Sequence, residues 1–237
     1  IRSYSMISVA NVSKSFGSKV VLSQLSLTLS PGEIVGFVGA NGSGKTTTMR
    51  AIMGLLPIDS GSITIDGQLQ GGSERISRSL GYLPEERGLY INEPLASQLH
   101  FFGELQGMNL QNRQQQISEL LSRLEIERYR DTAMRELSLG NQQRAQIAVA
   151  LLHSPRYLIL DEPFSGLDPL GAEALLKILR GESERGVGIL FSSHILAHVE
   201  EISDRVLVLS GGQIHVKENS SEELIDFYRE LEASHGK

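Results

Sequence analysis

The segment Gly39-Ala40-Asn41-Gly42-Ser43-Gly44-Lys45-Thr46 constrains the fold of this chain more than any other feature. It matches the phosphate-binding pattern G-x-x-x-x-G-K-[ST] at every specified position. The glycines allow the backbone to turn back and direct its N–H groups inward, which forms a concave anion site. Lys45 can place a positive charge on the β- and γ-phosphates, and the Thr46 hydroxyl can bind Mg²⁺. We therefore predict that a nucleoside triphosphate binds through Asn41, Gly42, Ser43, Gly44, Lys45, Thr46 and Thr47.

The residues on either side of this loop predict a strand before it and a helix after it. Glu33–Val38 is a largely apolar, β-branched run, and Thr47–Leu56 is typical of a helix. The phosphates would then lie at the positive end of that helix. The alternative is a glycine- and serine-rich surface turn that matches by chance, and the flanking elements argue against it.

The rest of the chain predicts an α/β fold that contains a helical insertion. From Pro94 to Leu152 the periodicity is helical, and elsewhere strands alternate with helices, which indicates a mostly parallel sheet. The remaining predicted strands are Ile7–Phe16, Val20–Leu29, Ser62–Ile65, Tyr157–Leu160, Val187–Phe191 and Arg205–Leu209. The predicted helices include one with Ile117, Leu120, Leu121 and Leu124 on one face, then 139–152, Leu170–Arg180 and Ile195–Ile202. Ser220 and Glu223 form a capping box before a last helix that has Leu224, Phe227 and Leu231 on one face.

These elements predict a single domain over residues 6–237. We expect an α/β core from residues 6–93 and 154–218, a helical subdomain over 94–153 and a C-terminal helix over 219–237. Residues 1–5 precede the first methionine, Met6, and are expected to be a remnant of cloning.

Composition excludes several classes of protein. The 237 residues contain no cysteine, which excludes disulfides and thiolate metal sites. The net charge is −6 without a long basic run, which argues against a nucleic-acid partner. No apolar stretch approaches the ~20 residues that cross a bilayer, so any membrane association is expected to come through a partner.

A second group of candidate residues follows the predicted strand Tyr157–Leu160. A buried strand that ends in Asp161 places a carboxylate at the edge of the sheet where ligands bind in α/β folds. Asp161 can hold Mg²⁺, and Glu162 can polarise the attacking water as a general base. The alternative is two acidic residues at an ordinary strand end, and the intact phosphate loop favours the catalytic interpretation.

Together with five further motifs in the family's order, these residues resemble the ATP-binding cassette (ABC) ATPases, the motor subunits of ABC transporters. The resemblance covers residues 7–218. Its further motifs are Phe16, Gly81–Glu85 in the place of the glutamine loop, Leu137–Arg144 in the place of the signature, Ser165–Asp168, and Ser192–His194. The resemblance implies a P-loop NTPase core with a mostly parallel sheet, an N-terminal antiparallel β subdomain and an inserted α-helical subdomain.

The resemblance also implies roles for individual residues. Phe16 would stack on adenine, and His194 would contact the γ-phosphate and orient Glu162. Ser138, Gly140 and Asn141 would bind the γ-phosphate of an ATP held by a second chain, with Asp168 beside the catalytic Glu. The alternatives are a core aromatic at Phe16, a capped or solvated histidine at a strand end, and a well-capped core helix after Ser138.

Three positions depart from the family's commonest pattern. The signature carries Leu139 and Asn141 where glycine and glutamine are usual, and Glu85 stands in the place of glutamine. A glutamate can bind the metal but cannot donate a hydrogen bond unless it is protonated. With these residues the chain is similar to the bacterial export subgroup, which includes sodium- and drug-extruding systems.

The function that this resemblance implies is an ATP-hydrolysing motor subunit of a bacterial exporter, working with Mg²⁺ and ATP. Its partners would be a second ATPase subunit, bound head to tail, and transmembrane permease subunits at the cytoplasmic face of the cell membrane, without direct insertion. The helix with Leu95, Leu99 and Phe102 is either a wall of the permease groove or part of the core. The alternative functions are a soluble cassette ATPase that acts on nucleic acid or ribosomes, and a regulatory nucleotide-binding module that does not hydrolyse ATP.

Overall fold

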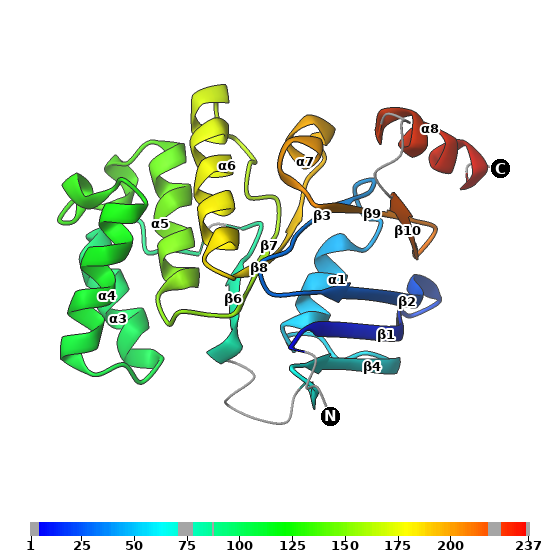
Figure 1. Cartoon of the computed structure of the whole chain (residues 1–237), viewed down its shortest axis with the longest axis horizontal. Helices are drawn as coiled ribbons and strands as arrows, with labels where there is room; N and C mark the ends of the chain where they lie inside the picture. The colour runs from blue at the N-terminus through cyan, green and yellow to red at the C-terminus, as the bar shows by residue number, and fades with distance from the viewer. Residues whose placement is uncertain (1–4, 71–77, 87, 218–223, 236–237) are drawn as a thin grey trace.

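The computed structural model describes residues 5–70, 78–86, 88–217 and 224–235. Strands in these segments form two sheets (Figure 1). The antiparallel sheet has the order β2-β1-β4-β5, with β1 Ile7–Phe16, β2 Lys19–Leu29, β4 Ser60–Ile65 and β5 Gln68–Leu69. The second sheet has the order β10-β9-β3-β8-β7-β6, with β3 Ile34–Val38, β6 Leu80–Leu83, β7 Tyr157–Leu160, β8 Gly188–Ser192, β9 Arg205–Ser210 and β10 Gln213–Lys217. Only β10 in this sheet runs antiparallel to its neighbour, so the predicted mostly parallel core is confirmed for the described residues.

Helices cover both faces of the parallel sheet. They are α1 Lys45–Ile52, α3 Leu95–Leu105, α4 Leu110–Arg123, α5 Leu139–Leu151, α6 Pro169–Glu184, α7 Leu196–Ile202 and α8 Leu224–His235, with short 3-10 turns at Glu127–Tyr129 and Met134–Glu136. Figure 1 shows α3, α4 and α5 gathered at one end of the molecule and the antiparallel sheet at the other.

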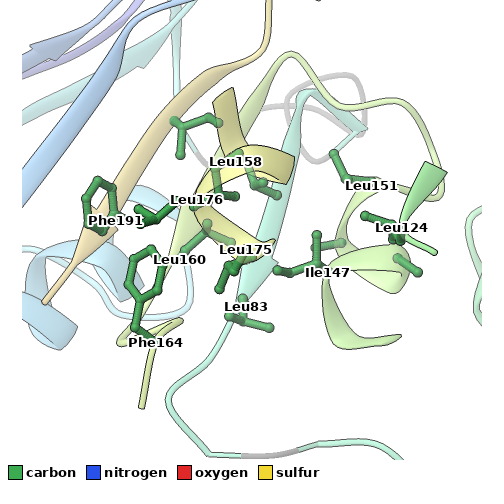
Figure 2. Packing of buried hydrophobic residues seen from close by; sticks show 14 of the residues in the cluster. Leu83, Leu124, Ile147, Leu151, Leu158, Leu160, Phe164, Leu175, Leu176 and Phe191 are labelled. Carbon is green, nitrogen blue, oxygen red and sulfur yellow. The ribbon is translucent and has the colours of Figure 1, made fainter. Parts of the chain in front are cut away.

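The central strands are continuously apolar because each of their two faces meets a different layer. In β3, Ile34 and Val38 belong to the core shared with α5 and α6, whereas Val35 and Phe37 belong to the core shared with α1 and the antiparallel sheet. Figure 2 shows the first core, where labelled side chains of α5 and α6 lie against those of β6, β7 and β8. Fully buried Leu, Ile and Phe side chains each contribute about 1.5–3 kcal/mol to such cores.

The structure corrects some predicted boundaries. The helix predicted at Thr47–Leu56 begins at Lys45 and ends at Ile52. It ends there because Gly54, with a φ of 72°, turns the chain. The N–H groups of Gly54 and Leu55 bond back to the carbonyls of Ala51 and Arg50, which is the geometry of a glycine-terminated helix end.

The other strands and helices match the prediction in part. The strands Ile7–Phe16 and Tyr157–Leu160 are confirmed, α6 continues four residues past the predicted end, and β5, β6 and β10 were not predicted as strands. The capping box at Ser220 and Glu223 lies outside the described residues. The C-terminal helix is present with Leu224 buried and Phe227 partly buried in the core.

The open question about α3 is settled by burial. Leu95 and Leu99 are fully buried in the core, so they cannot form the wall of a surface groove. Phe102 is partly buried and lines a small hollow beside Pro84. In the part of the chain that the structure describes, no helix combines the length and the apolar character that a membrane span needs.

Candidate functional site

The carboxyl ends of β3, β6 and β7 meet at one edge of the parallel sheet, and the residues that follow them line a common cleft. The volume of this cleft is about 400 Å³. The antiparallel sheet closes it on one side through the end of β1 and the start of β2. Its lining brings together most of the predicted site residues: Phe16, Asn41, Gly42, Gly44, Lys45, Thr46, Thr47, Glu85, Asp161 and Glu162, with Lys19 and Val21 in addition.

The predicted phosphate loop connects β3 to α1 in a conformation that depends on its glycines. Gly42 and Gly44 have φ values of 78° and 114°, a backbone region that other residues adopt only with strain. A side chain at Gly39 would bring its Cβ to 2.6 Å from the carbonyl oxygen of Leu209, so the loop lies directly against β9. Both constraints hold the loop in one shape.

Lys45 is buried at the start of α1 and turns back over this loop. Its Nζ donates hydrogen bonds to the carbonyl oxygens of Gly39 at 2.7 Å and Ala40 at 3.2 Å. Gly44, the residue before the helix, provides no side-chain cap, so the first N–H groups of α1 are not capped by a side chain. Such a helix start, with a lysine beside it, is a suitable site for an anion.

Asp161 follows β7 and is 1% exposed. Its Oδ1 accepts a hydrogen bond from the Ser192 hydroxyl at 2.7 Å, whereas its buried Oδ2 has no hydrogen-bond partner among the described residues. A buried carboxylate oxygen without a partner is costly unless a cation or water satisfies it. With Thr46 and Glu85 lining the same cleft, the oxygen donors fit a hard divalent cation such as Mg²⁺.

Within the described residues, no three His, Asp or Glu side chains cluster as a protein-only metal site. Beside phosphates, Mg²⁺ usually keeps substrate and water oxygens among its ligands, with only one or two carboxylates from the protein.

Glu162 and His194 face each other across the neighbouring ends of β7 and β8. His194 Nδ1 lies 2.8 Å from Glu162 Oε2, so the ring N–H can donate to the carboxylate. Glu162 has a φ of 50°, unusual for a residue with a side chain, and such positions cost on the order of 1 kcal/mol and cluster at functional sites. The structure thus places His194 beside Glu162, the residue that the resemblance implies His194 would orient.

Phe16 and Glu85 are both exposed at the rim of the cleft. Phe16 ends β1 with 51% of its surface exposed, so the alternative that it is a core aromatic is wrong. The ammonium group of Lys14 lies 5.6 Å from the centre of its ring. Glu85 follows β6 closely and reaches the same cleft.

The remaining predicted residues do not line this cleft in the described chain. Ser138 caps α5 by accepting the Asn141 N–H at 3.4 Å, and Asp168 caps α6 by accepting the Gly171 N–H at 2.7 Å. At Gly140 an added Cβ would meet no described atom closer than Leu167 Cδ2, at 4.0 Å. Packing within this chain therefore does not explain a glycine at position 140.

Sequence reasoning named Ser192 only as part of a motif and assigned it no contact. In the structure it bonds to both acidic residues, because its hydroxyl donates to Asp161 and accepts the Glu162 N–H at 2.7 Å. The sequence did indicate that these residues could meet. Asp161 and Ser192 come at the ends of two buried strands, and the ends of neighbouring parallel strands lie side by side.

Comparison with known proteins gives consistent matches. Residues 22–165 match the family model described as ABC transporter. An uncharacterized ABC transporter ATP-binding protein of Bacillus subtilis, YhaQ, is 42% identical over 208 residues, which cover 88% of this chain and 69% of YhaQ. The lipopolysaccharide export system ATP-binding protein LptB of Haemophilus influenzae is 36% identical, with 89% of each chain covered. The Nod factor export ATP-binding protein I of Sinorhizobium fredii is 36% identical, over 93% of this chain and 64% of that protein.

Solved structures agree with the sequence matches. The structure of an ATP binding subunit of an ABC transporter superposes with a TM-score of 0.79 at 31% identity, covering 98% of this chain and 95% of the other. A nucleotide-free ATP-binding cassette from an ABC transporter has a TM-score of 0.81 at 23% identity, a likeness of fold over 95% of each chain.

Proposed function

Because the chain belongs to the ABC transporter family of ATP-binding proteins, we propose that it hydrolyses ATP as the motor subunit of a bacterial exporter. One observation carries this proposal: the cleft joins the phosphate loop, the unpartnered oxygen of Asp161, and Glu162 paired with His194. A module that only binds nucleotide has no need for an oriented carboxylate at this place. The export-system relatives LptB and Nod factor export protein I support the direction of transport.

In the proposed reaction Glu162 is the general base. Its carboxylate takes a proton from the attacking water, and the His194 contact at 2.8 Å fixes the direction in which the carboxylate points. Lys45 would exchange its loop carbonyl partners for oxygens of the β- and γ-phosphates, where it stabilises the charge that develops during phosphoryl transfer. Mg²⁺, held by Thr46, Asp161 and Glu85, would neutralise part of the phosphate charge.

The second half of each site would come from another copy of the chain or a related subunit. Ser138, Gly140 and Asn141 lie at the start of α5, away from the cleft of their own chain, and Ser138 caps that start. A capped helix start with an unhindered glycine allows close approach of a phosphate. We propose that these residues contact the γ-phosphate of the ATP bound by the opposing chain, and that Asp168 lies at the same interface.

We also propose a place for the permease subunits, at the cytoplasmic face of the membrane. A hollow of about 380 Å³ is lined by Tyr90, Glu93, Ser97, Gln98 and Phe101. Tyr90 and Phe101 are half exposed and their rings pack edge to face. An apolar, aromatic hollow of this kind suits a helix that extends from a membrane protein.

The test of the hydrolytic role is Glu162→Gln in a phosphate-release assay. Losing a general base lowers the turnover number by about a hundredfold or more. ATP binding, measured by calorimetry, should persist because Lys45 and the loop are unchanged. Glu173→Gln is the matched control, since Glu173 is an exposed residue of α6 paired with Lys177.

The outcomes separate the candidate functions. Turnover close to wild type in Glu162→Gln contradicts the general-base role. A wild-type chain that binds ATP and releases no phosphate, even with its partners, supports the regulatory alternative instead.

A further inference from the structure

Ser192 is the last residue of β8 and lies between the two acidic residues of the cleft with none of its surface exposed. Its hydroxyl donates to Asp161 Oδ1 at 2.7 Å and accepts the backbone N–H of Glu162 at 2.7 Å. One buried side chain therefore bonds both to the residue proposed to hold the metal and to the residue proposed to activate water.

The sheet register explains this placement. β7 and β8 run parallel with Leu160 opposite Phe191, so the next residues along the two strands, Asp161 and Ser192, also lie side by side. On its other side Ser192 is opposite Phe37 of β3, the strand that leads into the phosphate loop. Ser192 is thus held by strands on both sides, and its position has little freedom.

The two hydrogen bonds have separate consequences for the site. The bond to Asp161 holds Oδ1 and leaves Oδ2 as the unpartnered oxygen, so it fixes the rotation of the carboxylate that would meet a cation. The bond from Glu162 fixes a backbone N–H in a conformation with a φ of 50°, which is otherwise unfavourable. That backbone conformation sets the direction in which the Glu162 side chain leaves the strand.

We infer that Ser192 is a positioning residue for ATP hydrolysis, acting through the carboxylate of Asp161 and the backbone of Glu162. The inference rests on the proposed function, since it assigns how the acids of that same site are aligned. A hydroxyl that served only to end the strand would need neither bond to be directed at an acidic residue of the cleft.

The experiment compares Ser192→Ala with Ser183→Ala in the purified chain with Mg²⁺ and ATP. Ser183 is a matched control because its hydroxyl also makes a hydrogen bond, to the Gly32 carbonyl at 2.8 Å. Gly32 precedes β3, whereas the phosphate loop follows this strand, so the bond lies far from the cleft. Losing a hydrogen bond to a charged group corresponds to a fall of roughly tenfold to a hundredfold in the turnover number of Ser192→Ala. The Mg²⁺ concentration for half-maximal rate should rise, while the dissociation constant of ATP measured with EDTA should stay unchanged.

Rescue completes the test. Ser192→Thr keeps the hydroxyl and should restore turnover and Mg²⁺ dependence, and Ser192→Cys, with a weaker donor, takes the place of the alanine variant if that variant does not fold. Turnover and Mg²⁺ dependence like those of Ser183→Ala overturn the inference while the proposed function stands. A wild-type chain without Mg²⁺-dependent turnover, even with its partners, overturns the proposed function itself.

Discussion

The ion pair between Arg123 and Glu182 joins the end of α4 to α6, and we predict that its two members contribute unequally to stability. Arg123 Nε lies 2.9 Å from Glu182 Oε1, and Arg185 Nη1 lies 3.5 Å from the same oxygen. The Glu182 side chain is 3% exposed, whereas the Arg123 side chain is 27% exposed. If Arg123 is removed, the Glu182 carboxylate stays buried away from water. If Glu182 loses its charge, the partly exposed Arg123 side chain keeps its access to water.

The size of the difference follows from this burial. Removing one partner of a buried pair costs about 3–5 kcal/mol. Because Arg185 remains near the carboxylate, we expect Arg123→Met to lower the free energy of unfolding by about 2 kcal/mol. Glu182→Gln removes a charge that burial already disfavours, so this substitution should lower the free energy of unfolding by less than about 1 kcal/mol.

The pH dependence gives this prediction a sign. Burial raises the pKa of Glu182 above its ordinary value of 4.5, against the opposing effect of Arg123 and Arg185. The stability that this shift contributes is fully present below pH 4.5 and is lost as the pH rises through the folded-state pKa. Without Arg123 the pKa rises further, so the deficit of Arg123→Met should shrink as the pH falls from about 7 to about 5.

Urea unfolding followed by circular dichroism at both pH values measures these differences. Lys177→Met, which breaks the exposed Lys177–Glu173 pair, is the control and should leave the free energy of unfolding unchanged. Equal losses in Arg123→Met and Glu182→Gln, or a deficit independent of pH, would refute the reasoning.

Two other substitutions test the interface and the packing. Gly140→Asp should leave the fold intact, because a Cβ there has 4.0 Å of clearance, but should place a carboxylate against the partner's phosphate. Light scattering with ATP should then detect no dimer, and dimerisation equal to wild type would remove the proposed contact. Gly36→Ala should lower the free energy of unfolding by about 1–3 kcal/mol, since its Cβ would overlap Val199 Cγ1 and come within 2.6 Å of Ser203 Oγ. An unchanged urea midpoint would contradict that packing argument.

Much of the core could be predicted because its strands are strongly apolar. Tyr157–Leu160 is a strand over those four residues, and burial on both faces explains why it has no polar residue. The edge strand Gln213–Lys217 gave no such signal, since its residues are exposed or half buried. The preceding Gly211 and Gly212, with φ values of 58° and 77°, suit a two-residue hairpin turn and were the available indication of β10.

The candidate site could be predicted where the residue types themselves indicate a chemical role. It could not be predicted where strand register determines which side chains meet. The phosphate loop, Asp161 and Glu162 were found from their pattern, and the structure gathers them in one cleft. The sequence could not distinguish Ser192 from Ser193, because only strand register determines which hydroxyl meets the acids. In the structure Ser193 bonds within its own turn, to Ile195.

The position of β6 has a mechanical consequence. It is the outermost strand of the parallel sheet, and the chain leaves from it into α3, α4 and α5 before returning through β7. β3, which carries the phosphate loop, is flanked by β9 and β8 in the interior of the sheet. Because α5 leads back into β7, which ends at Asp161, a movement of the three helices would reach the acidic residues of the cleft through β6 and β7, whereas β8 separates β7 from β3 and its phosphate loop.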